Sequence, residues 1–343
     1  MSAFKKWPVL RSAPLPLRSS PLAIADNNRL KIFSGSSNIS LASEVARYLG
    51  MDLGPQVQKR FADGELYIQI QESIRGADIY LIQPTCRPVN DHLMELLVMI
   101  DACRRASARQ ITAVLPYYGY ARADRKTAGR EAITAKLVAN MITTAGADRV
   151  LAMDLHSAQI QGYFDIPFDH VYGSPVLIRY IKEQIKEKQL PDVVVVSPDV
   201  GGVARARAFA KKLDDAPLAI IDKRRQAHNE VDVMNVIGDV RGKTCILVDD
   251  MIDTAGTITE GAKLLRREGA ERVYACATHA VFSGPAVERL STPGIFEEVI
   301  VTNSIPLAED KRFAQLRILS IANVLGEAIW RIHEDNSVSS MFR

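Results

Sequence analysis

The chain has 343 residues, of which 47% are hydrophobic and 24% are charged. This is enough for about two domains with buried cores. Its 43 Lys+Arg and 40 Asp+Glu leave a net charge of only +3, which excludes a general polybasic protein of nucleic-acid or membrane surfaces. No apolar run approaches the roughly 18 residues of a membrane helix. The four cysteines (Cys86, Cys103, Cys245 and Cys276) form no CxxC pair, so we expect buried thiols in a reducing, cytoplasmic compartment.

Residues 1–28 differ in composition from the rest of the chain. Up to Ala25 the segment carries four basic residues, no acidic residue and four prolines. Because proline excludes a long helix, we predict a disordered N-terminal tail. The Ser/Arg-rich, acid-poor composition also resembles a plastid or other organelle transit peptide. That alternative is less favoured, because such peptides form amphipathic helices.

From Leu30 onward, short apolar runs alternate with helical patterns. Between the runs, apolar residues follow helical spacing at 93–100, 133–141 and 258–265. Such alternation predicts parallel sheets flanked by helices. The predicted strands are 30–33, 66–70, 79–83, 111–115, 150–153, 193–196, 218–221, 245–248, 273–278 and 298–301.

A weak internal repeat indicates the number of domains. One apolar run leads into Pro116-Tyr-Tyr-Gly119 and a later one into Pro198-Asp-Val-Gly201. In each half a further apolar run ends on an aspartate, Asp154 or Asp249. We therefore predict two similar α/β domains, at 29–172 and 173–343.

The segment 245–258 is the most informative. An apolar strand ends on the paired carboxylates Asp249 and Asp250, and Asp253-Thr-Ala-Gly-Thr257 then opens a helix. Ligands of α/β sheets bind at the carboxyl ends of strands, and small residues let N–H groups at a helix start converge on a phosphate. With carboxylates for hydroxyl groups, this predicts a sugar-phosphate site. The alternative is a turn in which Asp253 or Thr254 caps the helix. A nucleotide P-loop is excluded, because Ala262 stands where lysine is required.

This segment resembles the phosphoribosyl pyrophosphate loop of type I phosphoribosyltransferases. Five further motifs follow the order seen in class I ribose-phosphate pyrophosphokinases. The resemblance runs from Leu30 to the C-terminus and implies two tandem type I phosphoribosyltransferase-like domains, each a mainly parallel sheet flanked by helices. The motifs are Phe61-Ala-Asp-Gly-Glu65, Tyr120-Ala-Arg-Ala-Asp-Arg-Lys126, Met153-Asp-Leu-His-Ser157, Ser197-Pro-Asp-Val-Gly-Gly202 and Asp222-Lys-Arg-Arg225.

The resemblance implies that ATP and ribose 5-phosphate react, with Mg²⁺ as cofactor, to give phosphoribosyl pyrophosphate and AMP. The product would serve nucleotide, histidine and tryptophan biosynthesis. Implied ATP-binding residues are Phe61, Asp63, Gly64, Glu65, Arg122 and Ala123, and the implied metal ligands are His156 and Asp199. Implied ribose 5-phosphate ligands are Arg225, Asp249, Asp250, Asp253, Thr254, Ala255, Gly256 and Thr257, and Lys223 and Arg225 are the implied catalytic pair on a mobile loop. Family members usually carry glutamine at the position of Ala123, so that side-chain contact is missing here.

Without the resemblance, each upstream motif has a structural alternative. The 61–65 segment suits a purine, or is a hairpin turn around a core phenylalanine. The cationic 122–130 segment suits a triphosphate, or is a solvated loop. A lone His156 is more typical of a structural histidine, because Mg²⁺ prefers oxygen ligands. The 222–225 run alone is typical of a solvated basic segment. His92, His170, His228, His279 and His333 are predicted to be structural or on the surface.

Two other functions stay open. An ordinary phosphoribosyltransferase would share the 249–257 loop but would be a single, smaller domain without the upstream ATP segments. A non-catalytic regulatory paralogue would have lost part of the catalytic loop. Retention of His156, Asp199, Lys223 and Arg225 disfavours that function, and Ala123 favours it. The resemblance also implies a homo-hexamer built from dimers, with phosphate activation and inhibition by nucleoside diphosphates.

Overall fold

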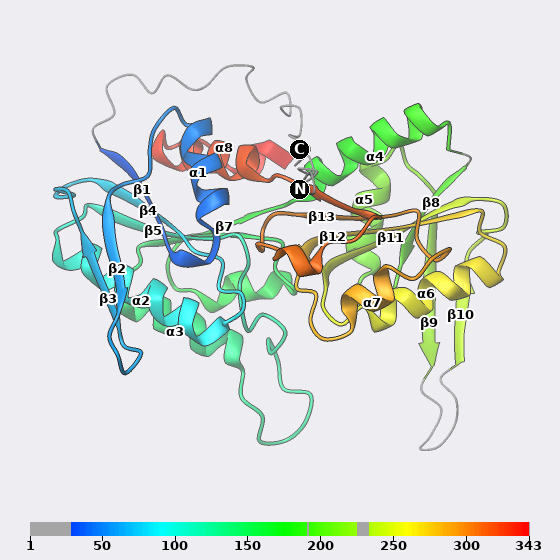
Figure 1. The fold of residues 1–343 in the computed structure, drawn as a ribbon, viewed down its shortest axis with the longest axis horizontal. Helices are drawn as coiled ribbons and strands as arrows, with labels where there is room; N and C mark the ends of the chain where they lie inside the picture. Colours follow the sequence, from blue (N-terminus) through cyan, green and yellow to red (C-terminus); the bar gives the residue numbers. More distant parts are fainter. Residues whose placement is uncertain (1–28, 191, 225–232, 343) are drawn as a thin grey trace, which may run out of the picture. The chain divides into compact units, whose positions relative to one another are not determined.

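The computed structural model describes residues 29–190, 192–224 and 233–342 (Figure 1). The predicted tail at 1–28 and residues 225–230 lie outside these ranges. Within them the chain folds into two compact units. The first unit comprises residues up to Gly173 with 304–306 and 321–342, and the second comprises 174–303 and 307–320. We expected the second domain to extend to the end of the chain, whereas the last segment packs in the first unit.

The first unit contains a parallel sheet with the strand order β1-β4-β5-β6-β7. All five residues of β4 are buried, as expected of a strand covered on both faces. Helices α1 (Ile39–Tyr48) and α8 (Ala322–His333) lie on one face, and α2 (Val89–Arg105) and α3 (Thr134–Ala145) on the other (Figure 1). The strands are β1 (Leu30–Ser34), β4 (Asp78–Ile82), β5 (Gln110–Leu115), β6 (Arg149–Met153) and β7 (Phe168–Val171).

Close packing holds α8 in this unit. A Cβ atom on Gly326 would lie 2.4 Å from Cδ1 of Tyr48 on α1, so the two helices approach closely at the glycine. The hydroxyl of Tyr48 donates to Glu327 at 3.3 Å. At the end of α8, Nδ1 of His333 lies 3.1 Å from the buried carboxylate of Asp78.

The pattern at 133–141 predicted the position of α3 but not its buried face. Leu137 is 54% exposed, whereas Ala135, Val138 and Ile142 are buried. This face of α3 packs in the same core as α2, which buries Leu96 and Ile100 as its spacing predicted.

The second unit contains a sheet with the order β10-β9-β8-β11-β12-β13-β14. Within the described residues of this sheet, only the β9–β10 pair is antiparallel. Helices α4 (Ser174–Lys188) and α5 (Val203–Lys212) cover one face, and α6 (Gly256–Arg267) and α7 (Ala286–Leu290) the other (Figure 1). The strands are β8 (Val193–Ser197), β9 (Leu218–Arg224), β10 (Val233–Ile237), β11 (Thr244–Ile252), β12 (Arg272–Ala280), β13 (Glu298–Thr302) and β14 (Leu316–Leu319).

One predicted boundary in this sheet is wrong. The strand does not end on Asp249 and Asp250 but continues to Ile252, because β12 runs beside it as far as Ala280 and extends the ladder. The strands that sequence patterns missed, β2 (Gln56–Arg60), β7, β10 and β14, are short. The strand β2 forms a separate antiparallel hairpin with β3 (Leu66–Ile70). Short 3-10 helices complete the fold: η1 (Ser36–Asn38), η2 (Ala158–Tyr163), η3 (Glu309–Lys311) and η4 (Ser339–Phe342).

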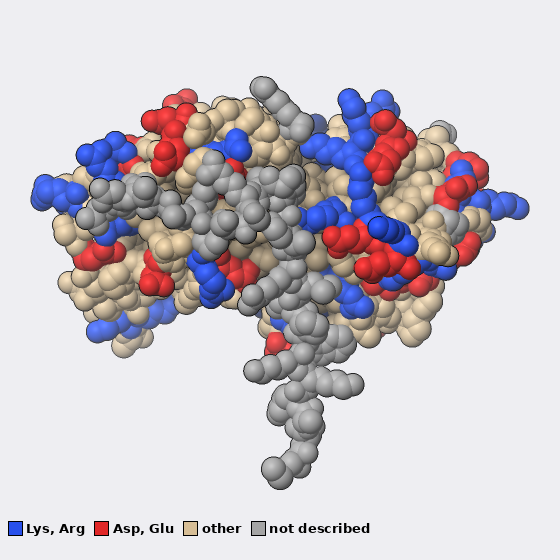
Figure 2. Space-filling view, turned by 90° about the horizontal axis from the view of Figure 1, so that it is seen from above, with Lys and Arg blue, Asp and Glu red and all other residues tan. Residues whose placement is uncertain are grey.

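Cysteine burial, surface charge and helix hydropathy also bear on what the composition predicted. All four cysteines are buried, as predicted, and burial raises the pKa of the Cys86 thiol to about 11. Acidic and basic side chains are interspersed on the face shown in Figure 2. Among the described residues, no helix is long and apolar enough to span a bilayer.

Candidate functional site

Two adjacent carboxylates of β11 are held by an arginine of α5. Nη1 of Arg205 lies 2.7 Å from Oδ1 of Asp249 and 3.1 Å from Oδ1 of Asp250. The Asp250 side chain is only 3% exposed and that of Asp249 27%. Burial first, and then the neighbouring charge of Asp250, raise the pKa of Asp249 to about 8, while Arg205 lowers it. A carboxyl pair that holds one proton can both accept from and donate to vicinal hydroxyl groups.

The loop that follows β11 leads directly into α6. Ala255 is the N-cap, has a left-handed φ of 59° and is preceded by Asp253 and Thr254. The side chain of Ala255 cannot cap the helix, so the alternative in which Asp253 or Thr254 is the N-cap residue is wrong. In the described residues, the N–H groups of Thr254, Ala255, Gly256 and Thr257 donate to no backbone carbonyl outside the regular elements, and the first N–H groups of a helix have no acceptor within it. Such a cluster at a helix N-terminus suits an anion.

The turn between β8 and α5 places Asp199 at the same sheet edge, because β8 is the parallel neighbour of β11. Oδ1 of Asp199 accepts the N–H of Gly202 at 2.7 Å, and its carbonyl accepts the hydroxyl of Ser197 at 2.7 Å. These bonds fix the exposed aspartate beside the carboxylates of β11. The structure thus brings together Asp199, Asp249, Asp250 and the 253–257 loop.

One of the two residues predicted to be catalytic, Lys223, falls near the end of β9. Lys223 belongs to this strand and its backbone pairs with Met234 of β10. The Lys223 side chain and the whole of Arg225 lie outside the described part of the chain. Their catalytic role therefore stays a prediction.

In the first unit, residues 61–65 form the tip of the β2–β3 hairpin. Phe61 is 57% exposed, so the alternative of a core phenylalanine is wrong, although the hairpin turn is present. Gly64 has a φ of 97°, and Oδ1 of Asp63 accepts the N–H of Glu65 at 3.1 Å. The ring of Tyr67 lies edge-on to Phe61 with centroids 6.1 Å apart. Exposed aromatic and carboxylate groups thus share one turn.

The loop with Arg122 and Ala123 follows β5 and is anchored at Asp124. This aspartate is buried and accepts the side-chain amide of Gln159 at 3.0 Å, while its carbonyl accepts the hydroxyl of Tyr163. The backbone of Ala123 donates to Tyr120 and accepts from Ala135, each at 3.2 Å. Arg122 is left on the surface. The loop is therefore ordered around one buried acid rather than a uniformly solvated segment.

His156 follows β6, the neighbour of β5, and is exposed. The preceding Leu155 donates its N–H to Nε2 of the half-buried His170 at 3.0 Å, and burial lowers the pKa of that imidazole. No cluster of three or more His, Cys, Asp or Glu that could hold a metal occurs in the described residues. Few protein ligands suffice for Mg²⁺. The ion usually keeps several waters, and it is bound by one or two protein carboxylates together with the phosphates of a substrate. His156 and Asp199 belong to different units.

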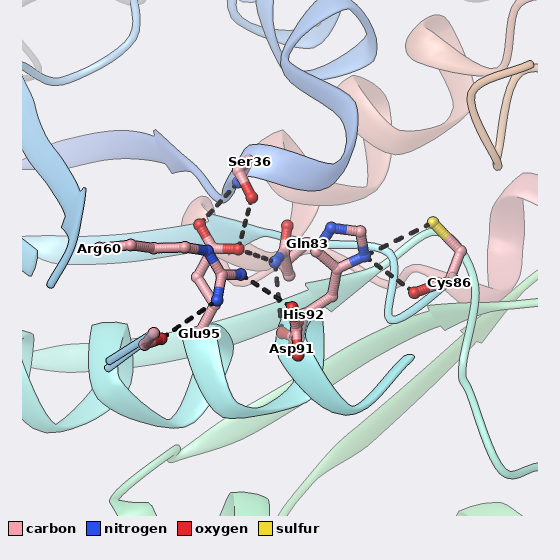
Figure 3. A network of polar contacts seen from close by, with 8 residues as sticks. Ser36, Arg60, Gln83, Cys86, Asp91, His92 and Glu95 are labelled. Carbon is pink, nitrogen blue, oxygen red and sulfur yellow. Dashed lines mark hydrogen bonds and ion pairs between the residues drawn. The ribbon is translucent and has the colours of Figure 1, made fainter. Parts of the chain in front are cut away.

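A polar network, buried around Glu95 and exposed at Arg60 and Asp91, links the start of α2 to the neighbouring strands (Figure 3). Glu95, 1% exposed, accepts the N–H and hydroxyl of Ser36 at 2.8 and 2.6 Å and the amide of Gln83 at 2.8 Å. Arg60, the residue before Phe61, pairs with Asp91 of the first turn of α2 at 3.1 Å. The adjacent Asn90 accepts the hydroxyl of Tyr120. The hairpin and the Arg122 loop are therefore both attached to the start of α2.

Sequence patterns missed several residues that organise these sites, notably Arg205, Asp124 and Glu95. For Arg205 a signal existed: a cation in the first turn of a helix opposes the helix dipole, which indicates a local acidic partner. For Glu95 the signal was an acid among the apolar positions of α2. The other predicted structural histidines agree, since His92 contacts the carbonyl of Cys86 at 2.8 Å and His279 is buried. His228 lies outside the described residues.

Comparison with known proteins identifies the family of the chain. Residues 30–146 match the family described as the N-terminal domain of ribose phosphate pyrophosphokinase, and residues 223–343 match the phosphoribosyl synthetase-associated domain. The chain is 78% identical over 335 residues to the ribose-phosphate pyrophosphokinase of Synechococcus elongatus, covering 98% of this chain and 100% of that protein. The protein of the same name from Nostoc is 76% identical over 335 residues, with the same two coverages.

A solved structure extends the comparison to three dimensions. The crystal structure of phosphoribosylpyrophosphate synthetase from Mycobacterium smegmatis has a TM-score of 0.85 and 48% sequence identity, covering 90% of this chain and 100% of that one. The fold is accordingly α/β, with mainly parallel sheets flanked by helices. Sequence motifs, fold and full-length similarity agree, and the chain belongs to the ribose-phosphate pyrophosphokinase family.

Proposed function

We propose that this chain transfers the β,γ-pyrophosphoryl group of ATP to the anomeric hydroxyl of ribose 5-phosphate, giving phosphoribosyl pyrophosphate and AMP. The observation that carries the proposal is the edge of the second sheet, where the carboxylates of Asp249 and Asp250 precede the N–H groups of 254–257. The N–H groups suit the 5-phosphate, whereas the carboxylate of Asp253 can accept from a ribose hydroxyl. The carboxylates suit the vicinal ribose hydroxyls.

The chemistry requires charge stabilisation more than a strong base. The anomeric oxygen attacks the β-phosphorus, the bond from that phosphorus to the α,β-bridging oxygen breaks, AMP leaves and the hydroxyl proton is released. Negative charge grows on the bridging and non-bridging oxygens, so fixed cations stabilise the transition state. We assign this role to Lys223 and Arg225, and Arg225 would also contact ribose 5-phosphate.

The nucleotide would occupy the first-unit elements. Phe61, Asp63, Gly64 and Glu65 at the hairpin tip offer an aromatic face and carboxylates for adenine, and the loop of Arg122 and Ala123 offers a cation for phosphates. His156 and Asp199 would hold Mg²⁺. When bound, the ion neutralises phosphate charge.

Release of AMP from ATP, measured with and without ribose 5-phosphate, tests the proposal. Release that depends on ribose 5-phosphate supports it. An ordinary phosphoribosyltransferase or a non-catalytic paralogue would give none, and this outcome would refute the proposed reaction.

The variant Lys223→Ala tests the catalytic assignment. We expect turnover to fall by orders of magnitude while ribose 5-phosphate affinity stays nearly unchanged, because the cation acts on the transition state. Lys211→Ala, which removes an exposed lysine from α5, is the matched control. Unchanged turnover in the Lys223 variant would contradict the assignment.

We further propose a homo-hexamer built from dimers that works in the cytoplasm and supplies nucleotide, histidine and tryptophan biosynthesis. This rests on the family membership. Light scattering of the purified chain would test the assembly, and a monodisperse monomer would contradict it.

A further inference from the structure

The segment that follows β12 lies directly behind the 253–257 loop and bonds its carbonyl groups. Three consecutive carbonyls of the loop accept hydrogen bonds from this segment, so the backbone is held from one side. Ile252 O accepts the N–H groups of Val281 and Phe282 at 3.0 Å each, Asp253 O accepts that of Ser283 at 2.9 Å, and Thr254 O accepts Nη1 of Arg289 at 2.9 Å.

These bonds determine where the amide N–H groups point. The carbonyl of one residue and the N–H of the next belong to one planar trans peptide and point in opposite directions. Holding the carbonyls of 252–254 from behind therefore aims the N–H groups of Asp253, Thr254 and Ala255 to the opposite side. Since the N–H groups of Thr254–Thr257 donate to no backbone carbonyl of the described loops, they can donate to an anion on this side.

The Thr254–Ala255 peptide needs particular support. Ala255 has a left-handed φ of 59°, a conformation that costs a non-glycine residue on the order of 1–3 kcal/mol unless its surroundings impose it. The other carbonyls in the row are held by main-chain N–H groups, whereas this one is held by a side chain.

Arg289 is suited to this task by its place on α7, beside α6 (Figure 1). Its Nη1 would lie 3.3 Å from a Cβ atom on Gly256, so the glycine leaves room for the guanidinium. A cationic donor also makes a stronger bond than a neutral one and polarises the amide that it contacts. Within the described residues Arg289 forms no ion pair, whereas Lys263, which lines the same pocket, pairs with Glu260 at 2.8 Å.

We infer that Arg289 is a positioning residue for the phosphate of ribose 5-phosphate. It holds the Thr254 carbonyl, and this aims and polarises the Ala255 N–H toward the phosphate. The inference rests on the proposed function. It assigns Arg289 no contact with the reacting atoms, so its loss affects binding of one substrate rather than the chemical step.

Steady-state kinetics of the full-length variant Arg289→Met test the inference. We expect KM for ribose 5-phosphate to rise about tenfold, the factor for one hydrogen bond to a charged group, with kcat and KM for ATP within about twofold. Arg289→Lys, which keeps a cationic donor, should recover part of the affinity. Lys263→Met is the matched control, since it removes a charge from the same pocket without touching the loop carbonyls.

Two results would overturn the inference: an unchanged KM for ribose 5-phosphate in Arg289→Met, or equal increases for both substrates. Titration calorimetry with ribose 5-phosphate gives the same comparison if turnover is too low to measure. Asp249→Asn separates the two proposals. If it does not weaken ribose 5-phosphate binding, the proposed site fails; if it does and Arg289→Met does not, only the role of Arg289 fails.

Discussion

Replacing Arg205 with methionine tests the charge balance around the carboxylates of β11. Removing one partner of a buried ion pair costs about 3–5 kcal/mol, because a buried charge is left uncompensated. Here the Arg205 and Asp249 side chains are 31% and 27% exposed, whereas Asp250 is 3% exposed. Water therefore recovers part of the loss, and we expect about 2–3 kcal/mol. For a unit of this size that lowers the unfolding temperature by roughly 5–10 °C.

The stability lost in Arg205→Met should depend on pH, in a direction that the pKa of Asp249 sets. The pKa of Asp249 in the folded protein is raised to about 8, above its usual value, so the unfolded chain ionises first as pH rises. Folded stability therefore falls between about pH 4 and about pH 8. Arg205 lowers this pKa, so its removal extends the fall above about pH 8. The free energy of unfolding that Arg205→Met loses relative to the unmodified protein should be larger at about pH 9 than at about pH 6.

Thermal unfolding followed by circular dichroism at the two pH values measures this deficit. Arg207→Met, which removes an exposed arginine from the same helix, is the matched control. In an Asp249→Asn background the Arg205 substitution should cost less, because one of its partners is already uncharged. A deficit that is independent of pH, or no larger than that of the control, would refute the reasoning.

Two further substitutions test the packing of the first unit. Glu95→Ala should destabilise the protein by about 3 kcal/mol, because it removes the buried acceptor of the Gln83 amide; an unchanged denaturation midpoint would argue against this role. Gly326→Ala should cost about 1–3 kcal/mol, because the new Cβ would lie 2.4 Å from Tyr48. Gly162→Ala, which meets nothing within 4 Å, should leave the unfolding temperature unchanged, and equal effects would contradict the argument.

Buried strands were predictable because their environment is uniform. The run 79–82 is apolar and buried on both faces, so its composition alone identifies it. By contrast, β2 reads Gln-Val-Gln-Lys-Arg and is half-buried or exposed. It becomes a strand because β3 pairs with it across the turn at Gly64. Such segments form strands because a partner strand pairs with them, not because their residues have a strong intrinsic preference for β structure.

In the candidate site, too, the sequence predicted some parts and missed others. Small residues between a strand and a helix predicted the 253–257 loop, because both the N–H cluster and the helix start arise within a few residues of chain. The partners that support the loop are distant: Arg205 lies 44 residues before Asp249, and Arg289 lies 35 residues after Thr254. No local pattern identifies such pairs.

By itself, the sequence determined the alternation of buried strands and helices, the near-balance of charge and the phosphate-type loop after β11. Each follows from the chemistry of neighbouring residues. Only the tertiary structure decided that α8 packs in the first unit, that Asp249 shares Arg205 with Asp250 and that a guanidinium holds the loop from behind. These features depend on which surfaces meet when the sheets form, and hydrophobic spacing along the chain does not specify that choice.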